Sequence, residues 1–263
     1  MLVAAFRGWN DGAQGASLAT GYLAQAWHAE RFAEIDPEEF FDFQAVRPHV
    51  VLEGGTTRRV NWPETVLFHA AVPDGERDVV LCLGIEPNLR WRTFTGELIG
   101  LACDLGVELV VTLGALLADV PHTRPAPVTG SATDPELVSE LGLAQSRYEG
   151  PTGIVGVLHD ACREANIPSA SLWAAVPHYA SLAASPKAAL ALCDRLAGLL
   201  GVEIALDDLE RAAEAYVRDL EARRDALGDE LDVPSGETLA AELTRFLREH
   251  EARRREEEED ESS

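Results

Sequence analysis

The sequence has 263 residues, of which 46% are hydrophobic, so it can form one large domain with a substantial core. Its formal net charge of −23 argues against nucleic acid or an anionic membrane as a partner, because either contact begins with a concentration of Lys and Arg. Apolar runs stay shorter than the roughly 18 to 20 residues of a membrane span, and the N-terminus lacks a signal-peptide pattern, so we expect a cytoplasmic protein.

Lysine and cysteine usage excludes further classes of protein. Lys187 is the only lysine, whereas phosphate-loop, Schiff-base and most ATP-using enzymes depend on a lysine ammonium. The cysteines lie far apart in apolar surroundings, which favours buried, reduced thiols over a zinc site or a redox pair. They are Cys82, Cys103, Cys162 and Cys193. We therefore expect neither a metal nor a cofactor.

The N-terminal half of the chain alternates between extended and helical patterns. It opens with an apolar strand at residues 2–6, a glycine-rich turn and an alanine-rich helix at 13–30. Later extended segments are predicted at residues 31–35, 46–52, 65–72 and 78–86. Gly54 and Gly55 predict a hairpin between β-prone flanks, and Gly106 is placed to end a helix that begins at residue 91.

The second half continues the same alternation. A fully buried strand is predicted at residues 107–119, and another at 168–176. The predicted helices are residues 134–142, 150–167 and 185–201. Asp134 is expected to cap the first of them, and Ser185 and Gly201 to bound the last. Apolar strands alternating with helices of this length predict an α/β fold with a mostly parallel sheet covered on both faces.

The chain changes character after residue 201, which we take as the end of an α/β domain spanning residues 1–201. Residues 202–252 predict a helical hairpin, and the charge run at 253–263 predicts a disordered acidic tail. The apolar stripe of the first helix is Leu209, Ala213, Tyr216, Leu220 and Leu227. It has two interpretations: packing against the α/β body, or an interface with another subunit or a client.

Polar side chains gather in loops that follow predicted strands. The carboxyl ends of parallel strands share one sheet edge, where ligands usually bind. The candidate cleft residues are Asn10, Asp11, Glu86, Arg90, Trp91, Asp119, His122, Arg124, Tyr148, Glu149, His178 and Tyr179. A Val-Pro-His step occurs twice, at residues 120–122 and 176–178, each time after a buried strand. Because proline ends the hydrogen-bond ladder, we expect the two histidines to be neighbours on this edge.

Each group of cleft residues has a structural and a functional interpretation. The loop around Asn10 and Asp11 can cap a helix or bind an anion. Glu86 and Arg90 can form an ion pair, which we favour, or orient a polar ligand. His122 can bond loop carbonyls or help Arg124 bind an anion. The sequence has no nucleophile elbow, no zinc-hydrolase motif and no cysteine beside a site histidine, so it predicts a site without a mechanism.

Five motifs in consistent order, GWNDGAQGA, LGIEPNLRW, TLGALLADVPHTRP, YEGPTGIVGVLH and LWAAVPHY, resemble the PAC2 family in its actinobacterial form. The resemblance spans roughly residues 1–201. It implies a three-layer α/β/α domain similar to phosphorylase-like and nucleosidase-like folds, and a homo-oligomer, with a trimer as one candidate. The family takes its name from a proteasome assembly chaperone.

The resemblance and the residues together give two hypotheses. The first is a non-catalytic, chaperone-like protein that binds itself and another protein such as a proteasome-related subunit, with the acidic helical hairpin as one contact surface. The second is a small-molecule-binding protein or enzyme that uses the strand-end cleft. That enzyme would be hydrolase-like or phosphorylase-like, or an ATP-grasp carboxylate–amine ligase, an activity assigned to some relatives.

Overall fold

The computed structural model describes residues 1–230 except 74, 76, 133 and 146. The strands are β1 (Leu2–Arg7), β2 (Glu30–Ile35), β3 (His49–Glu53), β4 (Thr57–Asn61), β5 (Thr65–Ala70), β6 (Val79–Ile85), β7 (Val110–Ala118), β8 (Val128–Ala132), β9 (Ala144–Gln145) and β10 (Ser169–Pro177). The α-helices are α1 (Gly15–Ala26), α2 (Trp91–Asp104), α3 (Pro135–Glu140), α4 (Ile154–Glu164), α5 (Pro186–Leu200) and α6 (Asp207–Glu230). Short 3₁₀ segments occupy Gly12–Gln14, Pro37–Glu39 and His178–Ala180.

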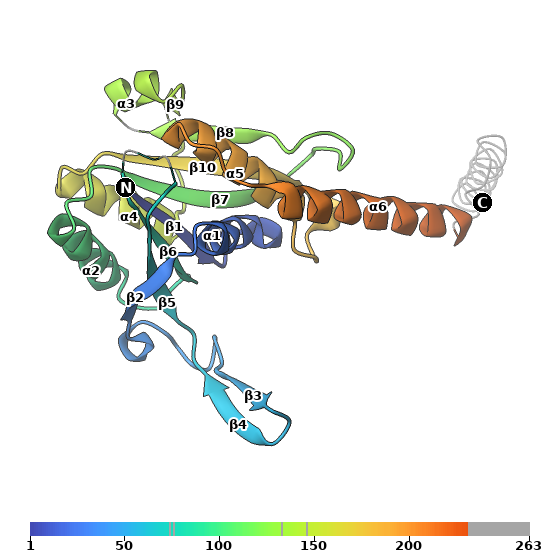
Figure 1. The fold of residues 1–263 in the computed structure, drawn as a ribbon, viewed down its shortest axis with the longest axis horizontal. Coiled ribbons are helices and arrows are strands. Elements are labelled where there is room, and N and C mark those ends of the chain that lie inside the picture. The colour runs from blue at the N-terminus through green and yellow to red at the C-terminus, as the bar shows by residue number, and fades with distance from the viewer. Residues whose placement is uncertain (74, 76, 133, 146, 231–263) are drawn as a thin grey trace, which may run out of the picture. The chain divides into compact units, whose positions relative to one another are not determined.

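The main sheet has the order β2-β5-β6-β1-β7-β10-β8-β9 (Figure 1). Its centre, β6-β1-β7-β10, is parallel, whereas β2 and β5 pair antiparallel with their neighbours and β8 pairs antiparallel with β10 and parallel with β9. The predicted mostly parallel α/β fold is therefore confirmed. The parallel centre matters for function because the loops after its four strands emerge along one edge.

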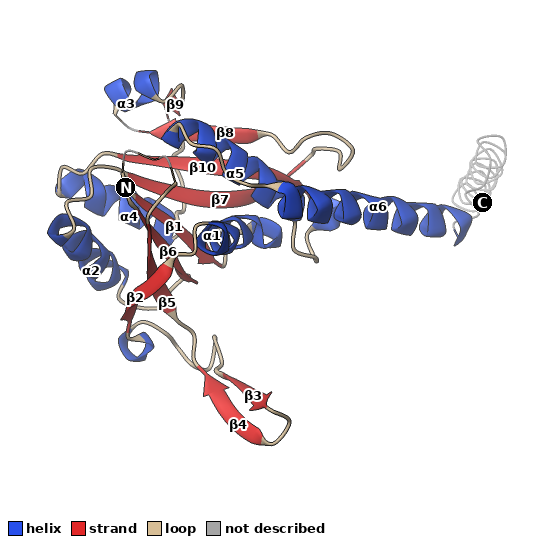
Figure 2. Cartoon of the chain, viewed as in Figure 1, coloured by secondary structure: helices blue, strands red, loops and turns tan. Residues whose placement is uncertain are grey.

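Helices cover both faces of the sheet, which gives three layers (Figure 2). Along β1, Val3 and Ala5 pack in a core with α1 and α5, whereas Leu2, Ala4 and Phe6 pack in a second core with α2 and α4. Successive side chains of a strand point to opposite faces, so a strand buried on both sides has to be apolar throughout. The continuous run LVAAF meets that requirement.

Several helix boundaries follow the predicted capping chemistry. Ser185 Oγ accepts from Ala188 N–H at the start of α5, and Gly201 ends that helix with a φ of +67°. Asp134 Oδ1 accepts from Glu136 N–H at the start of α3, at 2.8 Å. Gly106 follows α2 with a φ of +64°, a conformation that costs glycine little. These local signals fix where the helices begin and end.

The strands β3 and β4 form a separate two-stranded sheet whose turn contains Gly54 and Gly55, as predicted. Both glycines have positive φ, +60° and +79°, which suits a tight hairpin turn. Figure 1 shows this hairpin extending away from the eight-stranded sheet. We call residues 49–61 the arm.

The chain comprises two compact units, Met1–Arg218 and Asp219–Ser263. Within the first unit, Leu209, Ala213 and Tyr216 of α6 are buried, and Leu209 joins the core beneath α1 and α5. This part of the stripe therefore packs against the α/β body. Of the second unit, the described part is residues 219–230, which are helical. The second helix of the predicted hairpin and the predicted tail at 253–263 lie outside the described residues.

Two further features concern helices. None of the helices that the structure describes combines the length and the apolar content required to cross a membrane. Of the four cysteines, Cys103 is exposed, which corrects the prediction that all four are buried. It follows Ala102, which faces the core, and one residue turns an α-helix by about 100°, so Cys103 reaches the solvent side of α2.

Candidate functional site

The loops that follow β1, β6, β7 and β10 lie along the carboxyl edge of the parallel centre. These loops carry nine of the predicted cleft residues, Trp91 is the first residue of α2 after the β6 loop, and Tyr148 and Glu149 precede α4. The two Val-Pro-His steps are neighbours there, because Pro177 of β10 pairs with Ala118 at the end of β7. The sequence therefore located the edge correctly.

Glu86 joins three segments at this edge. Its Oε1 accepts hydrogen bonds from Asn10 Nδ2 at 3.1 Å and from Ile154 N–H at 2.8 Å, and its Oε2 accepts from Trp9 N–H at 3.2 Å. Ile154 is the first residue of α4, so the carboxylate occupies the positive end of that helix. The favoured ion pair between Glu86 and Arg90 is wrong: Arg90 pairs with Glu39 instead.

Glycines allow this close approach. A Cβ at Gly153 would lie 2.5 Å from Glu86 Oε1 and 2.4 Å from Asn10 Nδ2, closer than side chains tolerate. A Cβ at Gly8, where φ is +142°, would lie 2.9 Å from Glu86 Cβ. Gly8 and Gly153 therefore leave room for the Glu86 carboxylate. This carboxylate occupies the position at the N-terminus of α4 where an anionic ligand would otherwise bind.

Asp11 is a helix cap rather than part of an open anion site. Its Oδ1 accepts from Ala16 N–H at 2.7 Å, and its Oδ2 lies 3.3 Å from the Ser17 nitrogen, so it satisfies free amides at the start of α1. Burial raises the pKa of Asp11, and the hydrogen bonds from Ser17 and Ala16 oppose that shift. Gly15 packs tightly beside it, since a Cβ there would be 2.8 Å from Ala188 Cβ.

His122 lies in a closed cluster with Tyr179 and Lys187. Its backbone N–H donates to Tyr179 Oη at 2.9 Å, and its Nδ1 lies 2.8 Å from the same oxygen. Lys187 Nζ donates to the His122 carbonyl oxygen, and burial lowers the pKa of that amine. The sole lysine therefore helps to hold a loop in place.

The cavity beside His122 is too small for a metabolite. Its volume is about 10 Å³, room for one water molecule at most, and Arg124 and Tyr216 are among the residues around it. His122 is 8% exposed, and its Nε2 has no partner among the described residues. This arrangement accommodates a buried water rather than a substrate.

The remaining predicted residues do not converge on one point. Trp91 Nε1 donates to the Pro87 carbonyl, and Tyr148 Oη donates to the Pro151 carbonyl at 2.8 Å. Asp119 and His178 form an exposed pair with 3.8 Å between Oδ1 and Nε2. Glu149 is exposed. Among the described residues, no three His, Cys, Asp or Glu side chains are placed to hold a metal ion.

The edge presents several large apolar side chains to solvent. Trp9 is 66% exposed, Tyr179 64%, and Leu182 fully exposed. We call these residues, together with exposed Leu116 and Leu117 of β7, the apolar rim. Sequence reasoning named Tyr179 but missed the other rim residues, and leucines at the end of a buried strand look the same as core leucines. Large exposed apolar side chains gathered at one edge are typical of a contact surface for another macromolecule.

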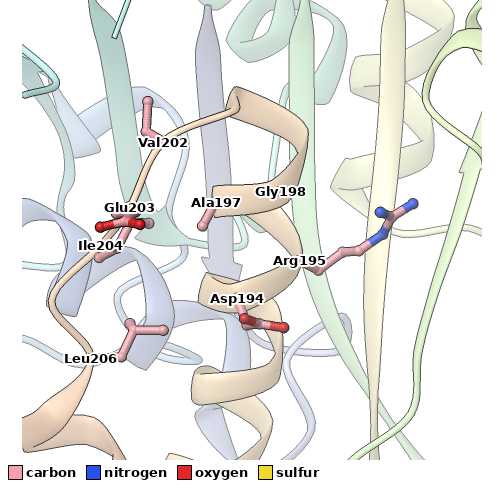
Figure 3. A pocket seen from close by; sticks show the side chains of 8 residues that line it. All are labelled: Asp194, Arg195, Ala197, Gly198, Val202, Glu203, Ile204 and Leu206. Carbon is pink, nitrogen blue, oxygen red and sulfur yellow. The ribbon is translucent and has the colours of Figure 1, made fainter. Parts of the chain in front are cut away.

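A larger hollow, of about 540 Å³, lies at the far end of α5. Figure 3 shows its lining: Asp194, Arg195, Ala197, Gly198, Val202, Glu203, Ile204 and Leu206. Arg195 extends away from the 202–206 segment and donates to the Leu141 carbonyl at 3.0 Å. At 1.5 Å rise per residue, Gly198 is roughly 16 Å along α5 from Lys187, so this hollow is separate from the carboxyl edge.

Comparison with known proteins places this fold among relatives. The PAC2 family matches residues 5–223. No curated protein is similar. A PAC2 family protein from Streptomyces avermitilis is 50% identical, with a TM-score of 0.78, over 84% of this chain and 94% of that one. A proteasome-assembly chaperone homologue from Mycobacterium tuberculosis is 45% identical, with a TM-score of 0.77, over 91% and 98%.

A more distant structure shares the fold alone. It is an archaeal proteasome activator from Pyrococcus furiosus, 16% identical with a TM-score of 0.70, covering 85% of this chain and 92% of that one.

Proposed function

This chain belongs to the PAC2 family, and on that premise we propose that it is a non-catalytic, assembly-chaperone-like protein. Its partners are proteasome-related subunits and further copies of itself, and it works in the cytoplasm. The apolar rim at the carboxyl edge is the surface that binds the partner protein.

One observation carries the proposal: several polar groups of the edge bond within the chain, whereas large apolar side chains of the same edge face solvent. The Glu86 carboxylate accepts hydrogen bonds from three donors, and the Asp11 carboxylate accepts from amides at the start of α1. Trp9, in contrast, is 66% exposed. A catalytic cleft needs polar groups aimed at a shared point in an accessible cavity, and a protein-binding edge needs exposed apolar and aromatic anchors.

The enzyme hypothesis is not favoured. The cavity between His122 and Arg124 has a volume of about 10 Å³, far below the roughly 300 Å³ at which ligand pockets begin. Lys187, the sole lysine, donates to a backbone carbonyl and has no free role as a phosphate clamp. The same residues thus count against both a phosphorylase-like reaction and ATP-grasp ligation.

The relatives support the choice of partner. A protein 45% identical to this chain over 91% of its length is described as a proteasome-assembly chaperone homologue. The predicted hairpin at 202–252 is a second proposed contact surface. Because Leu209, Ala213 and Tyr216 are buried against the body, its contact would be made by the part that follows them.

The test is binding of purified proteasome subunits from the source organism to the immobilised chain. The Trp9→Ser, Leu182→Ser double variant removes two exposed anchors without opening a core cavity. Leu105→Ser is the matched control, since Leu105 is 48% exposed but caps the C-terminal end of α2, away from the carboxyl edge where that helix begins. We expect the double variant to bind at least about tenfold more weakly, because interface anchors typically contribute about 2 kcal/mol or more each.

Three results would each contradict a part of this proposal. Equal binding by both variants and the wild type would exclude the rim as the contact surface. No binding by the wild type would refute the choice of proteasome subunits as partner. A metabolite that raises the melting temperature of the wild type but not of His122→Ala would favour the enzyme hypothesis.

A further inference from the structure

The arm has an apolar face that its own chain leaves uncovered. In the antiparallel register Val50 lies opposite Val60, and Leu52 opposite Arg58. Directly opposite residues share a face, and so do alternate residues of one strand, so these four side chains form one surface. Val50 and Leu52 are each 61% exposed, and Val60 is 46% exposed.

The other face of the arm is polar and is turned toward the body. Val51, Glu53 and Arg59 line a hollow of about 550 Å³ beside β2, and Arg59 Nη1 lies 3.0 Å from Glu53 Oε1. Val60 also borders this hollow, whereas Val50 and Leu52 do not. Trp62 continues the arm at its base, where its ring meets Phe43 edge to face at 4.9 Å.

An isolated two-stranded sheet is only marginally stable in water and needs a further layer against its apolar face. All ten residues of β3 and β4 are exposed, so the body supplies no such layer within the described chain. The arm has the composition of a contact element: an apolar centre with charged residues around it.

Charge indicates what covers the arm. The arm contains two arginines, Arg58 and Arg59, and one carboxylate, Glu53, and Arg47 lies just before it, in a chain whose net charge is −23. Two copies of so acidic a chain repel one another unless a basic segment of one meets the acidic surface of the other. The arm is such a segment, and Arg58 lies on its apolar face.

We propose that the arm packs its Val50, Leu52 and Val60 face against the acidic body of a second copy of this chain. The contact joins two different surfaces, so repeating it around a rotation axis closes a ring. This inference rests on the self-association that is part of the proposed function, and it assigns that association to a surface separate from the partner-binding rim.

The test is sedimentation velocity of the full chain over a range of concentrations. Val50→Thr, Leu52→Thr removes apolar surface and places β-branched threonines, which suit a strand, at both positions. Val51→Thr, in the same strand on the opposite face, is the matched control. We expect the double variant to raise the dissociation constant of self-association at least about tenfold, with the control within about twofold.

A second variant keeps the apolar face intact. Arg58→Glu should weaken self-association by a similar factor, and the weakening should shrink in 0.5 M salt, because salt screens the repulsion that the variant introduces. Circular dichroism and thermal melts should match the wild type, since the substituted side chains are exposed.

The outcomes separate this inference from the proposed function. An oligomer whose mass survives both arm variants would overturn the arm contact and leave self-association standing. A wild-type monomer at all concentrations would overturn both, while binding of proteasome subunits would still be decided by the rim variants. Arm variants that keep their mass but lose those subunits would assign the arm to the partner and overturn a contact between copies.

Discussion

Replacing Glu86 by alanine tests whether the carboxyl edge is tied together from inside. The substitution leaves Ile154 N–H at the start of α4 and the Asn10 amide without the acceptor that they share. It also releases Trp9 N–H, which is exposed and can bond water instead. The account therefore predicts a loss of stability rather than a loss of activity.

The magnitude follows from the two partly buried bonds. A hydrogen bond to a charged group contributes about 1.5–3 kcal/mol, and because Glu86 is partly solvated we take about 1–2 kcal/mol for each, at or just below the lower end of that range. The free energy of unfolding should fall by about 2–4 kcal/mol, out of a typical total of about 5–15 kcal/mol. For a domain of this size the melting temperature then falls by about 4–16 °C, at about 2–4 °C per kcal/mol.

The assay is urea unfolding followed by circular dichroism, with melting temperatures as a second readout. Glu39→Ala is the control, because it removes a carboxylate whose ion pair with Arg90 is exposed and should contribute less than about 1 kcal/mol. Gly153→Ala should destabilise the chain as well, since its methyl group would meet Glu86 Oε1. A Glu86→Ala variant as stable as the Glu39→Ala control would refute the reasoning and leave Glu86 available to a ligand.

Two further predictions concern buried groups. Burial lowers the pKa of His159 to about 4 from 6.5, so between these pH values the unfolded chain binds a proton that the folded chain does not bind. The free energy of unfolding should therefore fall by about 3 kcal/mol as the pH drops from 6.5 to 4. Urea midpoints should show a flatter pH profile for His159→Gln than for the wild type, and parallel profiles would contradict this. Ellman's reagent should modify one thiol per native chain, Cys103, because Cys82, Cys162 and Cys193 are buried and their pKa values are raised to about 12, 11 and 12. If the folded Cys103→Ser variant still reacts quickly with Ellman's reagent, the three remaining thiols are accessible, which would contradict this prediction.

Local features of the fold were predictable because local chemistry determines them. The caps of α3 and α5, the stop at Gly106 and the glycine turn of the arm each follow from residues within a few positions. The strand order β6-β1-β7-β10 was not predictable, because all four strands are apolar runs that carry little information about their neighbours.

Two strands were missed for a physical reason. Residues 128–132 have the sequence VTGSA, and their glycine and small polar residues read as a loop. They form β8 because they pair antiparallel with β10, where Ser131 Oγ and Ser171 Oγ lie 3.0 Å apart. The tertiary partner, rather than intrinsic propensity, decides such a strand. The strand β9 has only two residues, too few for any pattern.

The position of the candidate residues along the carboxyl edge was predictable, whereas their hydrogen-bond partners were not. Strand ends identified the carboxyl edge, yet Glu86 takes its donors from Asn10, 76 residues away, and Ile154, 68 residues away. No local pattern carries such a pairing. The exposure of Trp9 and Leu182 likewise depends on what the fold leaves uncovered. Sequence thus located the polar residues, and the structure showed that the chain itself bonds many of them.

The most direct test of the central claim is the affinity of purified proteasome subunits for the wild-type chain and for Trp9→Ser, Leu182→Ser, measured side by side with Leu105→Ser. The account predicts that the wild type and Leu105→Ser bind within about twofold of each other, and that the double variant binds at least about tenfold more weakly. Unchanged affinity in the double variant would contradict the claim that the carboxyl edge binds protein through its apolar rim.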